Sequence, residues 1–243
     1  MAAGQFKKLF FISMKVVSII QARTSSSRLR NKILLNFNNT TILGQVIESV
    51  KFSKYVDEIW VATSTNKEDD IVELICREKS IHCFRGSLNN VRSRFSLISK
   101  KTNADIIVRV TADNPFTEPS YIDQMVSYLK SNNNLDYISM NKLMILDGTG
   151  SEVFTSKALF KSIEMSNSEE DLEHVTPFMK NNAKFKRKYL KPSDSDYLCK
   201  TPFFLSVDVL EDYVRNINLL TKYSSTDTLK KIITDLNNNE RIF

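Results

Sequence analysis

Residues 21–32, QARTSSSRLRNK, place four basic side chains and four hydroxyl groups within twelve residues. In a turn of small residues, successive backbone amides form a concave site for anions, and Arg and Lys neutralise phosphate charge. A solvated, serine-rich turn has the same composition. The segment follows KVVSIIQA (15–22), a continuous β-branched run typical of a strand buried on both faces. This position favours a phosphate-binding loop at the end of a strand.

Two aspartates follow apolar runs further along the chain. Asp113 ends DIIVRVTAD (105–113), and Asp208 follows FFLSV (203–207), so we expect both at strand ends. Mg²⁺ takes one or two carboxylates and completes its shell with substrate oxygens and waters. Capping of a turn is the alternative role, because Asp often does this. With the basic loop, the two carboxylates point to metal-assisted phosphoryl chemistry with Mg²⁺ as the cofactor.

The elements that must position these residues follow from the apolar pattern. Short apolar runs alternate with segments of helical period, which predicts an α/β fold with right-handed crossovers and a mostly parallel sheet. Ligands of such sheets bind at the carboxyl ends of the strands. The expected strands are 15–22, 58–64, 81–84 and 105–113, and the expected helices are 42–50, 67–79, 88–101 and one that opens at Pro119. We expect a surface turn at 131–136 and an exposed hairpin or loop at 181–197.

Composition and charge exclude several classes of protein. The net charge of +6 suits either a nucleic acid or a pocket for small polyanions, and charge alone does not decide between them. Because basic residues are spread along the chain and interleaved with acids, we expect no nucleic-acid partner. No apolar run approaches the ~18–20 residues needed to span a bilayer. Lys7 and Lys8 precede an apolar stretch, as in a signal peptide, but Lys15 interrupts it, so we expect no export. Three cysteines without metal-ligand spacing predict free thiols and a cytoplasmic protein.

A set of motifs makes the sequence recognisable. QARTSSSRLRNK, VATSTNKEDD, FRGS, VRVTADNP, DGTGSEVF, EHVTPF and LSVD occur in this order over about residues 15–217. Their order and spacing resemble those of the CMP-sugar synthetase-like cytidylyltransferases, most of all the branch named for the spore coat polysaccharide biosynthesis protein F. The resemblance implies a Rossmann-like nucleotide-diphospho-sugar transferase fold, with a mostly parallel sheet flanked by helices. It also implies a short inserted region that often forms dimer contacts, so a homodimer is expected.

The resemblance also implies roles for individual residues. Arg23, Arg28 and Lys32 match the residues that grip the triphosphate, and Ala22, Ser26 and Ser27 line the same loop. Ala62, Thr63 and Ser64 match the strand end that reads the pyrimidine through backbone groups. Asp113 and Asp208 resemble the two Mg²⁺ ligands. Glu152 and His174 fall where the family keeps residues that face the acceptor, although both could instead hydrogen-bond within the protein and orient the inserted region.

The sequence departs from the family pattern at several positions. Ser25, Arg30 and Asn31 stand where the loop usually has glycines and a proline. Ala112 replaces the usual glycine before Asp113, and Asn114 and Phe116 replace different residues after it. Lost glycines restrict the backbone angles that are open to the loop. The path of the loop around the phosphates is therefore the feature that a structure must resolve.

The expected reaction is transfer of CMP from CTP to a sugar-like or phosphorylated acceptor, with release of pyrophosphate, for surface polysaccharide or glycoconjugate biosynthesis. Positioning and charge neutralisation catalyse such transfers, so no protein nucleophile is needed. Arg23, Lys32, Asp113 and Asp208 are the expected catalytic residues. A glycosyltransferase of the same architecture is one alternative, although TADNP lacks its usual D-x-D motif. A non-catalytic nucleotide-binding subunit is another, although both aspartates and all three loop cations are retained.

The length of 243 residues fits one large α/β domain. We expect an N-terminal extension at 1–14 and a single nucleotidyltransferase domain at 15–243. Within this domain, the nucleotide half spans about 15–116, the acceptor half about 117–217, and a C-terminal helix about 225–237.

Overall fold

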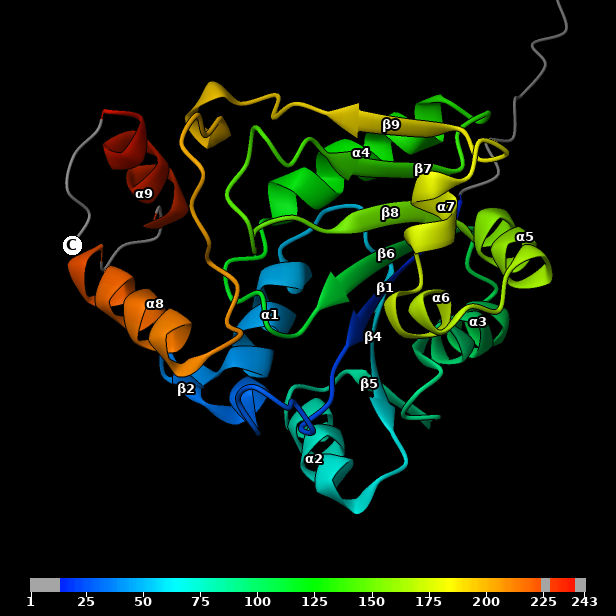
Figure 1. Cartoon of the computed structure of the whole chain (residues 1–243), viewed down its shortest axis with the longest axis horizontal. Helices are drawn as coiled ribbons and strands as arrows, with labels where there is room; N and C mark the ends of the chain where they lie inside the picture. The colour runs from blue at the N-terminus through cyan, green and yellow to red at the C-terminus, as the bar shows by residue number, and fades with distance from the viewer. Residues whose placement is uncertain (1–13, 224–227, 239–243) are drawn as a thin grey trace, which may run out of the picture.

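The computed structural model describes residues 14–223 and 228–238. The apolar runs of the sequence form the middle of a seven-stranded sheet with the order β5-β4-β1-β6-β8-β7-β9 (Figure 1). Strands β5, β4, β1 and β6 are parallel, β8 is antiparallel to β6 and β7, and β9 is parallel to β7. The strands are β1 (Val16–Gln21), β4 (Glu58–Ser64), β5 (His82–Gly86), β6 (Ile106–Thr111), β7 (Tyr137–Met140), β8 (Glu152–Thr155) and β9 (Arg187–Leu190). The predicted mostly parallel, Rossmann-like sheet is confirmed.

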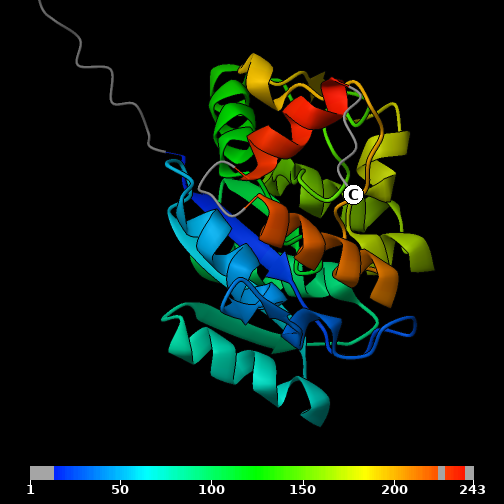
Figure 2. The same ribbon diagram turned by 90° about the vertical axis from the view of Figure 1, so that its left-hand side faces the viewer.

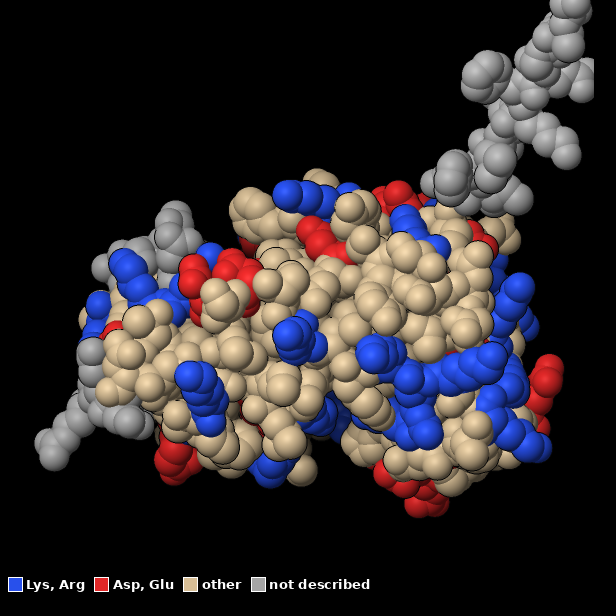
Figure 3. Space-filling view, turned by 90° about the horizontal axis from the view of Figure 1, so that it is seen from above, with Lys and Arg blue, Asp and Glu red and all other residues tan. Residues whose placement is uncertain are grey.

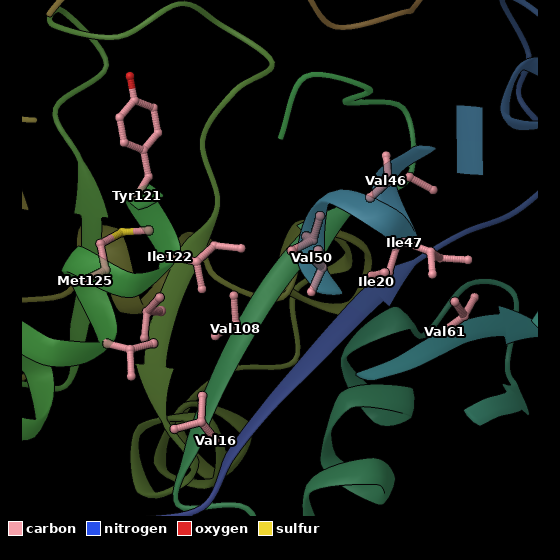
Figure 4. Close-up of a cluster of buried hydrophobic side chains, with 14 of the residues drawn as sticks. Val16, Ile20, Val46, Ile47, Val50, Val61, Val108, Tyr121, Ile122 and Met125 are labelled. Carbon is pink, nitrogen blue, oxygen red and sulfur yellow. The ribbon is translucent and has the colours of Figure 1, made fainter. Parts of the chain in front are cut away.

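Helices cover both faces of this sheet, which explains why its central strands are continuous apolar runs. Because side chains alternate along a strand, Val16 and Ile20 of β1 belong to one apolar cluster, and Val17 and Ile19 belong to the other. The first cluster includes side chains of α1 (Ile42–Lys51), α2 (Asp70–Glu78) and α4 (Pro119–Ser131), and Figure 4 shows part of it. The second includes side chains of α3 (Val91–Thr102), α5 (Ser156–Met165) and α7 (Pro177–Asn181).

A third apolar cluster lies beside the sheet. It joins α8 (Leu210–Lys222) and α9 (Thr228–Asn237) to the two-stranded ribbon of β2 (Asn36–Phe37) and β3 (Thr40–Thr41). Figure 2 shows these C-terminal helices packed along one side of the molecule. Leu205 and Val207, which precede Asp208, belong to the same cluster. The C-terminal helices therefore support the segment that carries Asp208.

Two expectations about local structure are wrong. Segment 181–197 contains β9, an edge strand whose charged residues Arg187 and Lys188 resemble the polar pattern of a loop. The run 203–207 is not a strand; apart from one isolated bridge between Asp147 and Phe204, it is irregular. Its amides bond at separate points to other segments, Val207 to the carbonyl of Asp113 at 2.9 Å and Leu205 to that of Asp147 at 2.8 Å.

Surface charge, membrane-spanning helices and the N-terminal extension were also subjects of expectations from the sequence. On the face seen in Figure 3, Lys and Arg lie in several groups with acidic and uncharged residues between them. No helix among residues 14–223 and 228–238 has both the length and the apolar character to span a bilayer. The predicted extension at 1–14 lies almost entirely outside the described residues.

Gly148 allows residues 203–207, the return segment before Asp208, to lie against the turn at residues 147–148. Its φ is +84°, a conformation that L side chains rarely adopt. A Cβ atom added here would lie 2.3 Å from the amide nitrogen of Ser206 and 2.7 Å from the carbonyl carbon of Leu205. These neighbours are backbone atoms and cannot rotate away, so only glycine fits this contact.

We therefore expect Gly148→Ala to lower the free energy of unfolding by more than about 2 kcal/mol, from backbone strain and displacement of residues 205–206. Gly150→Ala is the matched control, because its added Cβ would meet the mobile end of Ile145 at 3.0 Å. Urea unfolding of both variants measures the difference. Equal losses in the two variants would contradict the role given to Gly148.

Candidate active site

The loop of residues 21–32 is held against the end of β4 by one buried carboxylate. Asp69, which is 1% exposed, accepts hydrogen bonds from the amide and the hydroxyl of Thr24, both at 2.8 Å, through Oδ1. Its Oδ2 accepts from the amide of Ser64 at 3.2 Å and its hydroxyl at 2.5 Å. Burial alone would raise the pKa of Asp69, but the hydrogen bonds from Ser64 and Thr24 outweigh it and lower this pKa. Asp69 is therefore ionised and fixes the loop.

The loop turns without the glycine that the family has at residue 31. Asn31 adopts φ 57° and ψ 19°, a left-handed conformation that Asn tolerates better than most residues. Its amide donates to the carbonyl of Thr24 at 2.9 Å and closes the turn. Of the positions where glycines are replaced, Ser25 and Ala112 do not have a positive φ. The lost glycines therefore leave the turn intact.

Lys32 joins the two aspartates that the sequence singled out. Its ammonium nitrogen lies 2.7 Å from Oδ2 of Asp113 and 2.8 Å from Oδ1 of Asp208. The guanidinium of Arg28 lies 2.8 Å from the same oxygen of Asp208. Asp113 follows β6, and the hydrogen bond from the amide of Val207 to the carbonyl of Asp113 brings the return segment beside it. The two carboxylates thus meet at one cation, although Asp208 does not end a strand.

The carboxylate pair fits a hard divalent cation. Two carboxylates that converge on a single cationic atom provide the oxygen ligands that Mg²⁺ prefers. Within the described part of the chain, no group of three or more His, Cys, Asp or Glu side chains could hold a metal. A metal here would therefore need further oxygens from a ligand or from water.

These residues line a cavity of about 670 Å³ at the carboxyl ends of β1 and β6. Most of the predicted site residues line it: Ala22, Arg23, Ser26, Ser27, Arg28, Lys32, Asp113, His174 and Asp208. Thr63 and Ser64 do not, because both are fully buried beneath the loop. Arg23 is held at 2.8 Å by Glu173, which also lines the cavity.

Arg94 is a cavity residue that the sequence analysis missed. Its side chain is 1% exposed; Nη1 donates to the carbonyl of Ala62 at 2.8 Å, and Nε is buried without a partner. Burial lowers the pKa of Arg94 to about 10. Gly86 makes room for it, because a Cβ there would lie 2.9 Å from Cγ of Arg94. No sequence signal marked it, since charged residues on helices usually face solvent.

A second cavity of about 180 Å³ adjoins the first. The two share Arg109, Thr111, Asn114 and Asp147 as lining residues. Lys142 and Lys180 line only the second, and so does Glu152. Arg109 is a charged residue inside an apolar strand, which is costly unless it is paired. A charge within the apolar run DIIVRVTAD is therefore the signal in the sequence that could have identified it.

Glu152 joins Arg109 to the segment after α6 (Glu169–His174). One carboxylate oxygen accepts from Arg109 at 2.5 Å and Thr176 at 2.9 Å, and the other from Tyr137 and Lys180, both at 2.7 Å. Burial alone would raise the pKa of Glu152, but the charges of Arg109 and Lys180 outweigh it and lower this pKa to about 2. With four donors already bound, Glu152 is better suited to orient Arg109 and Lys180 than to bind an acceptor.

His174 lies at the wall of the first cavity, before a strained turn. It is exposed and lines the first cavity but not the second. Val175 has φ 69° and ψ −47°, and the amide of Thr176 donates to the carbonyl of His174 at 2.8 Å. This is a γ-turn with positive φ, a strained conformation for a β-branched residue. The turn places Thr176 beside Glu152 and His174 at the first cavity.

Comparison with known proteins identifies the family. Residues 17–239 match the sequence profile of the family described as cytidylyltransferase. The chain belongs to the cytidylyltransferase family. An uncharacterised Methanocaldococcus jannaschii protein, MJ1063, is 38% identical over 231 residues, which cover 94% of this chain and 93% of that protein. The resemblance noted from the motifs is thus confirmed, and the enzyme is a nucleotidyltransferase.

Two further relatives agree with this assignment. The spore coat polysaccharide biosynthesis protein SpsF of Bacillus subtilis is 29% identical to this cytidylyltransferase over 206 residues, covering 82% of this chain and 83% of that protein. The structure of a cytidylyltransferase from Leptospira borgpetersenii has a TM-score of 0.83 and 31% identity, and covers 93% of this chain and 94% of that one. Similarity therefore extends over nearly the whole chain.

The lowered pKa of Glu152 predicts a specific dependence of stability on pH. Because this pKa falls from 4.5 to about 2 on folding, its contribution is present above pH 4.5 and is lost as the pH falls towards 2. Glu152→Gln should lower the free energy of unfolding by roughly 3 kcal/mol at pH 7, and this deficit should shrink between pH 4.5 and 3. Urea unfolding of both proteins across this range measures it. A deficit that does not change with pH would contradict the ionised, paired carboxylate.

Proposed function

We propose that this cytidylyltransferase transfers CMP from CTP, bound in the first cavity, to an anionic sugar-like acceptor, bound in the second, and releases pyrophosphate. The observation that carries this proposal is that the two cavities adjoin at Arg109, Thr111, Asn114 and Asp147, which line both of them. An acceptor oxygen in one cavity can therefore approach an α-phosphate in the other where the two cavities meet. The reaction forms a bond from that oxygen to the α-phosphorus and breaks the bond to the β-phosphate.

The charges at the two cavities support different roles. Arg23, Arg28 and Lys32 converge on the first cavity and suit a triphosphate. The second cavity contains Arg109, Lys142 and Lys180 as cations and Glu152 and Asp147 as acids. Three cations against two acids leave one net positive charge, which favours an acceptor with a carboxylate or a phosphate. The relative named for spore coat polysaccharide biosynthesis supports a role in surface polysaccharide or glycoconjugate synthesis.

Asp113 and Asp208 would hold Mg²⁺ against the phosphates, where the ion supplies neutralisation of the charge on the phosphate oxygens. Arg23 and Lys32 would then stabilise the charge of the leaving pyrophosphate. A cytoplasmic location and a homodimer remain predictions; the three free cysteines are compatible with a reducing compartment.

Release of pyrophosphate tests this function. The enzyme is incubated with each of four nucleoside triphosphates and with sugars that carry a carboxylate, a phosphate or no charge. We expect release with CTP and an anionic sugar, and a loss of at least about tenfold in turnover, or ~1.4 kcal/mol, for Asp113→Asn and for Asp208→Asn at unchanged melting temperature. Equal release with charged and neutral sugars would exclude the proposed acceptor class.

Arg94 can account for the choice of base. Its side chain lines the first cavity, where Nη1 shares the carbonyl of Ala62 with the amide of Ala22, and its buried Nε has no partner. Cytosine presents two adjacent acceptors, O2 and N3, whereas uracil has a donor at N3. A guanidinium donates only, so it favours cytosine and opposes the N3–H of uracil. We therefore assign Arg94 to recognition of the base.

Arg94→Met should lower kcat/KM for CTP roughly 10- to 100-fold, the value of a hydrogen bond to a charged group, and change that for UTP much less. Arg92→Met is the matched control. Arg92 is equally buried but donates to the carbonyl of Ser166 at 2.6 Å and does not line the cavity. Its loss should reduce stability and leave the CTP-to-UTP ratio unchanged. The assignment of Arg94 fails if its variant also keeps the wild-type ratio.

A further inference from the structure

The position of the Lys32 ammonium has a consequence for metal binding. The side chain is 9% exposed, and its nitrogen lies within 2.8 Å of a carboxylate oxygen of both Asp113 and Asp208. A divalent cation that bridges these carboxylates would lie at nearly the same point. The ammonium and such an ion therefore compete for one place.

The charges around this point are balanced without a metal. The carboxylates of Asp113 and Asp208 face the ammonium of Lys32 and the guanidinium of Arg28, two negative charges against two positive ones. A divalent ion would add two positive charges within a few ångströms of two cations, in a partly buried place where screening is weak. The protein alone therefore disfavours the ion.

The number of metal ligands that the protein provides also disfavours a divalent ion in the absence of nucleotide. Two carboxylates are too few for an ion that takes about six oxygens, and no larger acidic cluster occurs among the residues that the structure describes. The phosphates of a nucleotide change both conditions. They bring the missing oxygens, and they also attract the flexible Lys32 ammonium away from the carboxylates.

We propose that Lys32 occupies the cation place of Asp113 and Asp208 until nucleotide phosphates draw it away, so that the metal site forms only when the nucleotide is bound. This inference rests on the metal role given to the two aspartates above. By linkage, the factor by which the nucleotide strengthens metal binding equals the factor by which the metal strengthens nucleotide binding. Lys32 thereby makes the enzyme bind the metal together with its substrate rather than alone.

Binding of Mn²⁺ in the absence of nucleotide tests the proposal, with free Mn²⁺ followed by electron paramagnetic resonance. We expect Lys32→Met to bind Mn²⁺ at least about tenfold more tightly than the wild type, within the range of typical coupling between sites. Lys32→Gln keeps polar contacts without the charge and should show the same direction if the Met variant is too unstable. Mn²⁺ should raise the melting temperature of these variants more than that of the wild type.

Two controls separate local competition from net charge. Arg30→Met removes one positive charge from the same loop, but Arg30 pairs with Glu68 at 3.0 Å and does not line the cavity. It should leave Mn²⁺ affinity within about twofold of the wild type. Adding Asp113→Asn to Lys32→Met should remove the gained affinity, which places the ion at the aspartate pair.

The proposal is wrong if folded Lys32→Met and Lys32→Gln bind Mn²⁺ no more tightly than the wild type, or if Arg30→Met gains as much. No CTP or acceptor enters these measurements. A protein that fails to transfer CMP but shows the gain would therefore contradict the proposed function and leave the competition at Lys32 standing.

Discussion

The hydrogen bonds to the carboxylate of Asp69 hold the loop of residues 21–32 on the sheet, and the site depends on that loop. Asp69 receives its four donors from Thr24 and Ser64, residues that follow or end two neighbouring strands. Without this carboxylate, the buried amides of both residues would lose their acceptor, at a cost of about 1–3 kcal/mol each. The loop also carries Arg23, Arg28 and Lys32. One buried anion thus fixes the cations that face the cavity, and it does so from beneath, without entering the cavity.

Several features of the site oppose stability and are held in place by the rest of the fold. Arg94 is a buried cation with an unpartnered nitrogen, and Val175 has a strained positive φ beside the cavity. Such features persist where packing around them over-determines the conformation. Here Phe95 and Ile98 anchor the helix of Arg94 in the second apolar cluster, and Val175 itself is fully buried in it. The second apolar cluster therefore holds both unfavourable features in place.

The sequence predicted the parts of the structure that depend on local pattern. Buried strands such as 15–22 have continuous apolar runs because both faces are covered, so their positions along the chain and a site at their carboxyl ends could be inferred. The family motifs also placed Asp113, Asp208 and the loop cations, which line one cavity. The pattern failed where context decides. The edge strand β9 carries charges like a loop, and Asp208 depends on a backbone contact from Gly148 that has no periodic signal. Arg94 points inward only because Gly86 leaves room for its stem.

The absence of a β-ladder at 203–207 gives the site a division between rigid and adjustable parts. Asp113 follows β6 in the middle of the sheet, where hydrogen bonds on both sides fix the backbone. Asp208 is carried by a segment that bonds to residues 113 and 147 through Val207 and Leu205, and to α8 through the amide of Asp208, which donates to Asp212 at 2.9 Å. Such separate contacts lack the continuous ladder of a central strand, so a small shift of this segment costs less. If the ammonium of Lys32 gave way to a metal ion as proposed, residues 203–207 could take up a change in the distance between the two carboxylates while the loop of residues 21–32 stays fixed. An aspartate at the end of a second central strand would instead have to keep one separation from Asp113, whichever cation lies between the two carboxylates.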